Sequence, residues 1–185
     1  SDFTNLESIK SEAFTSFPDL YKLIKQSKDR CVLVIGPDKL REHVETLYVI
    51  RDQLKKSGYE GIILKEHQDI KEHSHEEKMN LLGHLSKFVI CENSYPSGHI
   101  DELNICTRNR LVTVILQRED IEGGATLMQS SYAVDFSFVK KVSYKPDFLC
   151  SVIDKAVKIA ENLIVQRTQA LNKEYKYRQA LPKGD

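Results

Sequence analysis

Four short apolar runs, separated by three stretches with helical spacing, do most to limit the folds open to this chain. The runs are CVLVIGP at 31–37, GIILKE at 61–66, FVICE at 88–92 and LVTVILQ at 111–117. Such short runs, rich in β-branched residues, are typical of buried strands. The amphipathic segments between them cover 39–56, 74–87 and 100–108. Strands that alternate with helices predict a parallel sheet with helices on both faces.

The pattern continues on both sides of these runs. A long connection at 118–136 leads to a fifth predicted strand at 138–144, and two helices are predicted at 3–15 and 18–27. We therefore expect an α/β, flavodoxin-like three-layer sandwich with a mostly five-stranded parallel sheet, extra N-terminal helices and a long C-terminal helix. The expected divisions are a helical extension at 1–29, an α/β core at 30–146, and a long helix and tail at 147–185, packed on the core.

Helix ends and helix length carry further information. Ser74 and Glu77 have the spacing of a capping box, and Gly58 suits the left-handed stop of the preceding helix. The final helix, from about Asp147 to Arg178, is longer than the core of such a domain needs, and its apolar positions continue to Leu171. We therefore expect it to mediate a homo-oligomer.

Composition excludes several classes of protein. Lys plus Arg equals Asp plus Glu at 27 each, so the chain is not a generally basic nucleic-acid-binding protein. No apolar run approaches the ~18 residues of a membrane span. The four cysteines form no Cys-x-x-Cys pair, which argues against a zinc site. Disulfide staples are not expected in a chain of this size that shows no secretory signal, so we expect reduced thiols. These observations predict a cytoplasmic protein with no nucleic-acid or membrane partner.

The strand ends indicate where a ligand would bind. In parallel α/β sheets this is the crevice beyond the C-terminal ends of the strands, where the strand order reverses. Gly36, Pro37 and Asp38 follow the first strand, Glu66 follows the second, and the segment from Glu92 to Glu102 follows the third. We expect these residues to meet at one cleft.

Two of these segments have alternative interpretations. Gly36-Pro37-Asp38 offers free helix N–H groups to an anion, with Arg41 near enough to help, but it is equally a simple turn. Gly98 and Glu102 stand four residues apart at a predicted helix start. There the carboxylate of Glu102 could act on a sugar C1, or it could merely favour the positive end of the helix dipole.

Four segments resemble the nucleoside 2-deoxyribosyltransferase-like and TIR-like superfamily: VLVIGP, SGYEGIILKE, LSKFVICENSYPSGHIDELNIC and RLVTVIL. The similarity covers about residues 31 to 117. In the transferases a strand ends in Gly-Pro, a third strand ends in a carboxylate, and Gly-x-x-x-Glu presents the catalytic Glu. Gly36-Pro37, Glu92, and Gly98 with Glu102 match these positions. TIR NAD hydrolases have a Ser-containing loop before their catalytic Glu, which Ser94, Ser97 and Glu102 resemble.

The resemblance implies a nucleotide-binding core that cleaves or transfers at an N-glycosidic bond of a nucleoside, a nucleotide or NAD. Glu102 would attack or stabilise C1, and Glu92 would position the base or a water. The segment from Gly36 to Asp38, with Gly98, would hold sugar and phosphate. No metal or redox cofactor is needed for that chemistry. The alternative is a non-catalytic TIR-like module that senses a nucleotide or self-associates.

Other side chains remain open candidates. His99 could contact a base or phosphate, or be an exposed helix residue, and Tyr132 could stack on a base or simply pack. His67, His73 and His75 lie among carboxylates and could bind a transition metal, although such loops are more often solvated surface. The Lys-, Arg- and Tyr-rich tail is more typical of a solvated helix end than of an RNA-binding strip.

Overall fold

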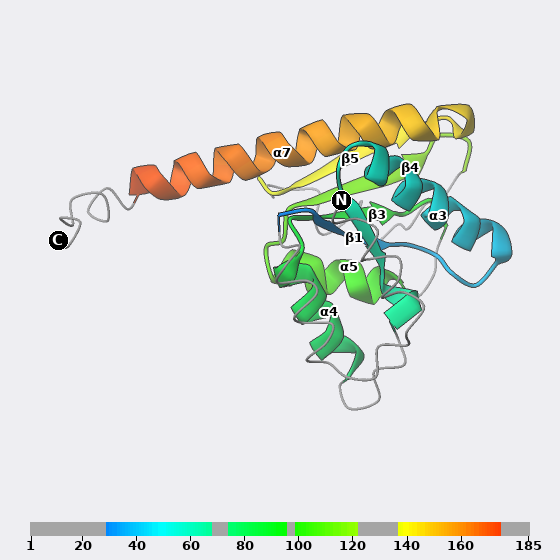
Figure 1. Ribbon diagram of the computed structural model, residues 1–185, viewed down its shortest axis with the longest axis horizontal. Helices are drawn as coiled ribbons and strands as arrows, with labels where there is room; N and C mark the ends of the chain where they lie inside the picture. The colour runs from blue at the N-terminus through cyan, green and yellow to red at the C-terminus, as the bar shows by residue number, and fades with distance from the viewer. Residues whose placement is uncertain (1–28, 68–73, 96–98, 122–136, 175–185) are drawn as a thin grey trace, which may run out of the picture.

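The structure of the protein is a computed structural model that describes residues 29–67, 74–95, 99–121 and 137–174. Within these ranges the centre is a five-stranded parallel sheet of order β2-β1-β3-β4-β5 (Figure 1). The strands are β1 (Cys31–Ile35), β2 (Glu60–Ile63), β3 (Phe88–Glu92), β4 (Thr113–Arg118) and β5 (Val139–Tyr144). This topology confirms the predicted flavodoxin-like α/β fold.

In the described ranges, helices cover both faces of the sheet (Figure 1). The helices are α3 (Arg41–Lys56), α4 (His75–Leu85), α5 (His99–Arg108) and α7 (Leu149–Glu174). Phe88 and Ile90 of β3 belong to a buried cluster with side chains of α3 and α7. Val89 and Cys91 point the other way, into a cluster with side chains of α4 and α5. This alternation decides on which side of the sheet a residue at the end of β3 must lie.

The helix ends follow the capping signals. Ser74 accepts a hydrogen bond from the Glu77 N–H at 3.2 Å, and the Glu77 carboxylate accepts from the Ser74 N–H, so the capping box is confirmed. Gly58 after α3 has φ 84° and is therefore in the left-handed region, as predicted. The second strand is shorter than expected, because Leu64–His67 forms a 3-10 turn, η1. The final helix begins with another 3-10 turn, η2 (Pro146–Phe148). The predicted N-terminal helices lie outside the described residues.

The exit of β1 is closely packed. A Cβ added to Gly36 would lie 2.8 Å from Leu47 Cδ2, 3.1 Å from Glu92 Cβ and 3.2 Å from the Glu92 carbonyl oxygen. Gly36 therefore lets β1 and the end of β3 approach each other beneath α3. The contact with a backbone oxygen matters most, because a backbone moves less easily than a side-chain end.

We expect Gly36→Ala to destabilise the protein by roughly 1–3 kcal/mol through overpacking. The measurement is the free energy of unfolding in urea, with ligand binding followed in parallel. A variant of unchanged stability that had lost only binding would show that the glycine serves a ligand instead.

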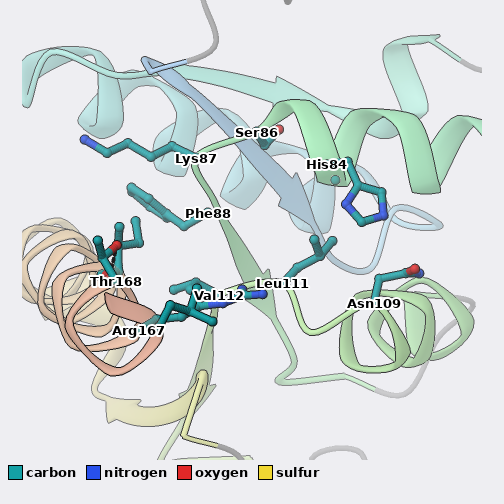
Figure 2. Close-up of a pocket in the computed structure, with 12 residues that line it drawn as sticks. His84, Ser86, Lys87, Phe88, Asn109, Leu111, Val112, Arg167 and Thr168 are labelled. Carbon is teal, nitrogen blue, oxygen red and sulfur yellow. Dashed lines mark hydrogen bonds between the residues drawn. The ribbon is translucent and has the colours of Figure 1, made fainter. Parts of the chain in front are cut away.

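Helix α7 is longer than the sheet face that it covers. Its buried side chains end at Leu163, whereas Val165 and Leu171 are about half exposed. Figure 1 shows the helix running on past the sheet, and a cavity lies beside this part of it (Figure 2). Among the described residues, no helix combines the length and the apolar character that crossing a membrane requires.

The predicted homo-oligomer stays a prediction. We expect light scattering to return a multiple of the 21.3 kDa chain mass. A value of one chain mass at high protein concentration would contradict it.

Within the described part of the chain, the sheet ends in two edge strands of different character. β2 is only four residues long. β5 pairs with β4 on one side, and its Lys140 and Lys141 are exposed.

Candidate functional site

Side chains from two strand exits and two helix starts gather at the C-terminal edge of the sheet. The strand order reverses between β1 and β3, so their exits form the switch point at which ligands bind in such sheets. Asp38 follows β1, Lys65 follows β2, and His99 and Glu102 lie in the first turn of α5. His75 begins α4. We call Asp38, Lys65, His75, His99 and Glu102 the switch-point cluster.

Glu102 has the most unusual environment of the cluster. Its side chain is 14% exposed, and His75 Nε2 lies 3.3 Å from its Oε1. Burial, and then the negative charges of Asp38 and Asp101, raise the pKa of Glu102 from 4.5 to about 7. The carboxyl group can therefore take up or release a proton near neutral pH, as acid–base and nucleophilic groups of active sites often do.

This shift makes stability depend on pH in a defined direction. Between pH 4.5 and 7 the folded protein binds more protons at Glu102 than the unfolded chain does. The contribution of this group to the stability of the folded state is therefore fully present below pH 4.5, and it is lost as the pH rises through 7. We expect Glu102→Gln to melt higher than the parent at pH 8, and the two proteins to melt alike near pH 4. Thermal melting across this range is the measurement, and a parallel offset at every pH would contradict the assignment.

His99 is a structural member of the cluster. It is buried, and its Nε2 lies 2.8 Å from the side-chain oxygen of Asn93, just after β3. Burial lowers the pKa of His99 to about 4, against the opposing charge of Asp38. The ring is therefore neutral at pH 7 and joins the start of α5 to the end of β3. It is not the exposed helix residue that the sequence left open.

Lys65 brings the β2 exit toward the β1 exit. Its Nζ donates a hydrogen bond to the Asp38 carbonyl oxygen at 2.8 Å and lies 3.9 Å from the Asp38 carboxylate. Asp38 is in turn near enough to act on the charges of His99 and Glu102. Sequence reasoning did not select Lys65, although its position directly after an apolar strand was the available signal.

Glu92 lies in a different environment from Glu102. It continues the alternation of Phe88 and Ile90, so its side chain points toward the face of α3 and α7, whereas α5 covers the opposite face. The structure thus places the two carboxylates at the same edge but on opposite sides of the sheet. The expectation that both would line one cleft is not supported by this geometry.

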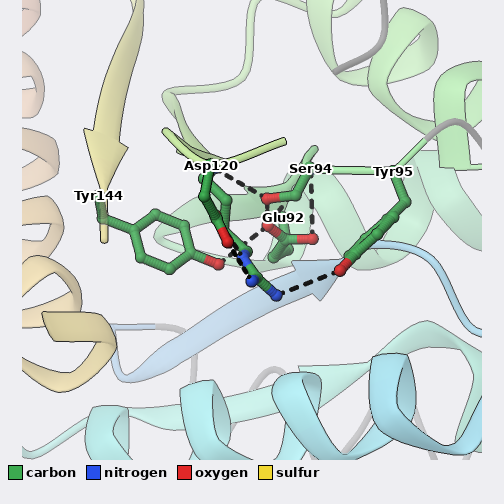
Figure 3. A network of polar contacts seen from close by, with 6 residues as sticks. Glu92, Ser94, Tyr95, Asp120 and Tyr144 are labelled. Atoms are coloured by element: carbon green, nitrogen blue, oxygen red, sulfur yellow. Dashed lines mark hydrogen bonds and ion pairs between the residues drawn. The ribbon is translucent and has the colours of Figure 1, made fainter. Parts of the chain in front are cut away.

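The Glu92 carboxylate is held by Ser94, just after β3, and by Tyr144 of β5 (Figure 3). It accepts hydrogen bonds from the Ser94 N–H at 3.3 Å, from the Ser94 hydroxyl, and from the Tyr144 hydroxyl at 3.1 Å. The Ser94 hydroxyl oxygen also accepts from the Arg118 N–H at 2.9 Å. Burial raises the pKa of Glu92, and the bonds from Ser94 and Tyr144 oppose that rise. This network joins the C-terminal ends of β3, β4 and β5.

The network continues to an aromatic pair. Arg118 donates to the Tyr95 hydroxyl at 3.1 Å and pairs with Asp120 at 2.7 Å (Figure 3). The Tyr95 ring lies 4.4 Å from the ring of His43, centroid to centroid. His43 is 8% exposed, and neither ring nitrogen has a hydrogen-bond partner among the described residues. Sequence reasoning missed this set, because its members are far apart in the chain.

The other predicted residues have separate positions. Arg41 pairs with Glu45 at 2.8 Å on the exposed surface, and Glu66 pairs with Arg51 at 3.0 Å. Neither joins the switch-point cluster through a contact that the described residues show. Pro37 lies in the β1 exit between Gly36 and Asp38. Three predicted site residues lie outside the described ranges: Ser97, Gly98 and Tyr132.

The metal-site alternative gains no support from the described ranges. Within them, no group of three or more His, Cys, Asp and Glu side chains is arranged to hold a metal ion. His73 and the side chain of His67 lie outside the described residues, and His75 pairs with Glu102.

The site has to be interpreted from its own side chains, because no protein-family model matches the sequence and a search of curated proteins finds no match.

Proposed function

We propose that the protein binds a nucleoside, a nucleotide or NAD at the switch-point cluster and cleaves or transfers at its N-glycosidic bond. The observation that carries this proposal is the largely buried Glu102, with a pKa of about 7, beside His75 and near Asp38. A carboxyl group that titrates near neutral pH suits chemistry in which it must be ionised at one step and neutralised at another.

In the proposed reaction, the bond between the sugar C1 and the base nitrogen breaks. The electron pair leaves with the base. A nucleoside or nucleotide base takes up a proton as it leaves, whereas the nicotinamide of NAD leaves neutral without one. The ionised carboxylate of Glu102 bonds to C1 or stabilises its positive charge. Water, or the nitrogen of an acceptor base, then bonds to C1 and loses a proton, and the carboxylate is released. His75, at 3.3 Å, is in reach to exchange a proton with Glu102.

Asp38 and Lys65 supply the binding part of the proposal. The Asp38 carboxylate can accept hydrogen bonds from sugar hydroxyls, and Lys65 can meet a phosphate. Their side chains are 34% and 43% exposed, so both remain accessible from solvent. In this proposal Glu92 is a structural residue, since its carboxylate is engaged by Ser94 and Tyr144.

A specific observation favours a second candidate function, binding without cleavage. Glycosidases commonly use two carboxyl groups that flank the scissile bond. Here Glu92 and Glu102 face opposite sides of the sheet, and this leaves Glu102 without the partner that the sequence predicted. A nucleotide sensor would need only the recognition groups.

One experiment separates the two candidates. The protein is incubated with NAD and a panel of nucleosides and nucleotides, with and without an acceptor base, and released base is followed by chromatography. Binding of each compound is measured in parallel by calorimetry. Base release supports the enzyme, binding without release supports the sensor, and neither binding nor release rejects both.

A further inference from the structure

A cavity lies at the N-terminal edge of the sheet, at the far end of the strands from the switch-point cluster (Figure 2). Its volume is about 390 Å³. Phe88, Leu111 and Val112 contribute from the strand entrances, and Ile164 and Leu171 contribute from α7. Leu171 is 46% exposed, so this end of α7 presents an apolar side chain beside a cavity that polar groups such as Lys87 and Arg167 also line.

Hydrogen bonds within the chain engage polar side chains around the cavity. Arg167 donates to the Arg110 carbonyl oxygen at 2.7 Å, close to the end of α5. Lys87 Nζ lies 3.3 Å from the Tyr59 hydroxyl. The Ser86 hydroxyl donates to the Leu82 carbonyl oxygen at 2.6 Å. Each of these three side chains therefore has a hydrogen-bond partner within the chain, so none of them needs a ligand as its partner.

The described chain begins beside this cavity. Residue 29 lies two positions before β1, and the Lys87 N–H donates to the Cys31 carbonyl oxygen at 2.8 Å. Val32 is then the register partner of Phe88, which lines the cavity. The 28 residues before position 29 are therefore attached to the sheet at the edge where the cavity opens.

The sequence nearest to this attachment has an apolar stripe of its own. In 18–27, Leu20, Leu23 and Ile24 recur at helical spacing, and such a stripe needs an apolar surface to cover it. A tether of only a few residues would give the segment a high effective concentration at the cavity. We propose that residues 18–27 of the same chain cover the cavity, with this stripe seated against Leu111, Ile164 and Leu171.

Disulfide trapping in the full chain tests this docking. In a Cys150→Ser background, which removes the exposed native thiol, Leu171→Cys is combined with Cys at one position from 20 to 24 in turn. We expect intramolecular disulfides at 20, 23 and 24 to form faster than at 21 and 22, as measured by non-reducing electrophoresis and peptide mass mapping. In the matched control, the partner cysteine replaces Val165, which is exposed on α7 but does not line the cavity.

Charge substitutions provide a second measurement. In the protein with cysteines at positions 24 and 171, Leu20→Asp is expected to slow disulfide formation roughly tenfold, because a buried apolar side chain is lost. Lys22→Asp, a change of charge off the stripe, is expected to leave the rate unaltered. Equal trapping at all five positions, trapping as efficient with the Val165 partner, or disulfides that join two chains would each overturn the proposal. The last result would assign the cavity to a second copy.

Discussion

Replacing Glu102 with glutamine is expected to reduce base release at least about a thousandfold. Glutamine keeps the shape of the side chain but cannot carry the negative charge that attacks C1 or stabilises a cationic transition state. A loss of several kcal/mol in transition-state stabilisation corresponds to this factor, since each ~1.4 kcal/mol changes a rate tenfold. The measurement is turnover of both proteins on the substrate that the panel identifies.

The control for this prediction is the thermal stability of the variant. Glu102→Gln removes a desolvated carboxylate near Asp38, so the variant should melt no lower than the parent at pH 8. Loss of turnover with intact melting and binding would assign the chemistry to this group. Unchanged turnover would show that Glu102 has no catalytic role. The observed cleavage would then need another nucleophile or electrostatic group.

Glu92→Ala is expected to destabilise the protein by roughly 2–4 kcal/mol, because it removes buried atoms and leaves buried donors without an acceptor. The donors are the N–H and hydroxyl of Ser94 and the hydroxyl of Tyr144. For a chain of this size the melting temperature should fall by roughly 5–15 °C. Calorimetry or urea unfolding at pH 7 measures the loss.

Two comparisons sharpen the test of Glu92. Tyr144→Phe removes only one donor and should cost about 1 kcal/mol. Glu92→Gln keeps one acceptor oxygen and should lie between the parent and Glu92→Ala. A Glu92→Ala protein with full stability and lost ligand binding would contradict the structural role and return Glu92 to the ligand site.

The fold could be predicted because its signals are local and periodic. The strands appear as short β-branched runs, and Ser74 with Glu77 marks the start of α4 through neighbours in the chain. A parallel sheet then brings the strand exits to one edge by geometry alone. Glu102 could be selected in the same way, since its place in the first turn of α5 depends on a nearby helix start.

The partners within the site could not be predicted to the same extent. The pairs Lys65–Asp38 and His75–Glu102 join separate elements, so no spacing in the sequence announces them. The side of the sheet on which Glu92 lies was within reach, because it continues the alternation of Phe88 and Ile90. The convergence of the strand exits favoured one cleft for both carboxylates, and this alternation argues against it.

The edge strands carry a consequence for the protein at high concentration. A sheet edge with free N–H and C=O groups is a template on which another chain can add a strand and begin to aggregate. β2 offers a template of only four residues, and the exposed Lys140 and Lys141 of β5 would confront the same charges on an incoming copy. Substituting both lysines with threonine should therefore leave the chain folded but prone to precipitate, because the two ammonium groups would no longer repel a second copy at this edge.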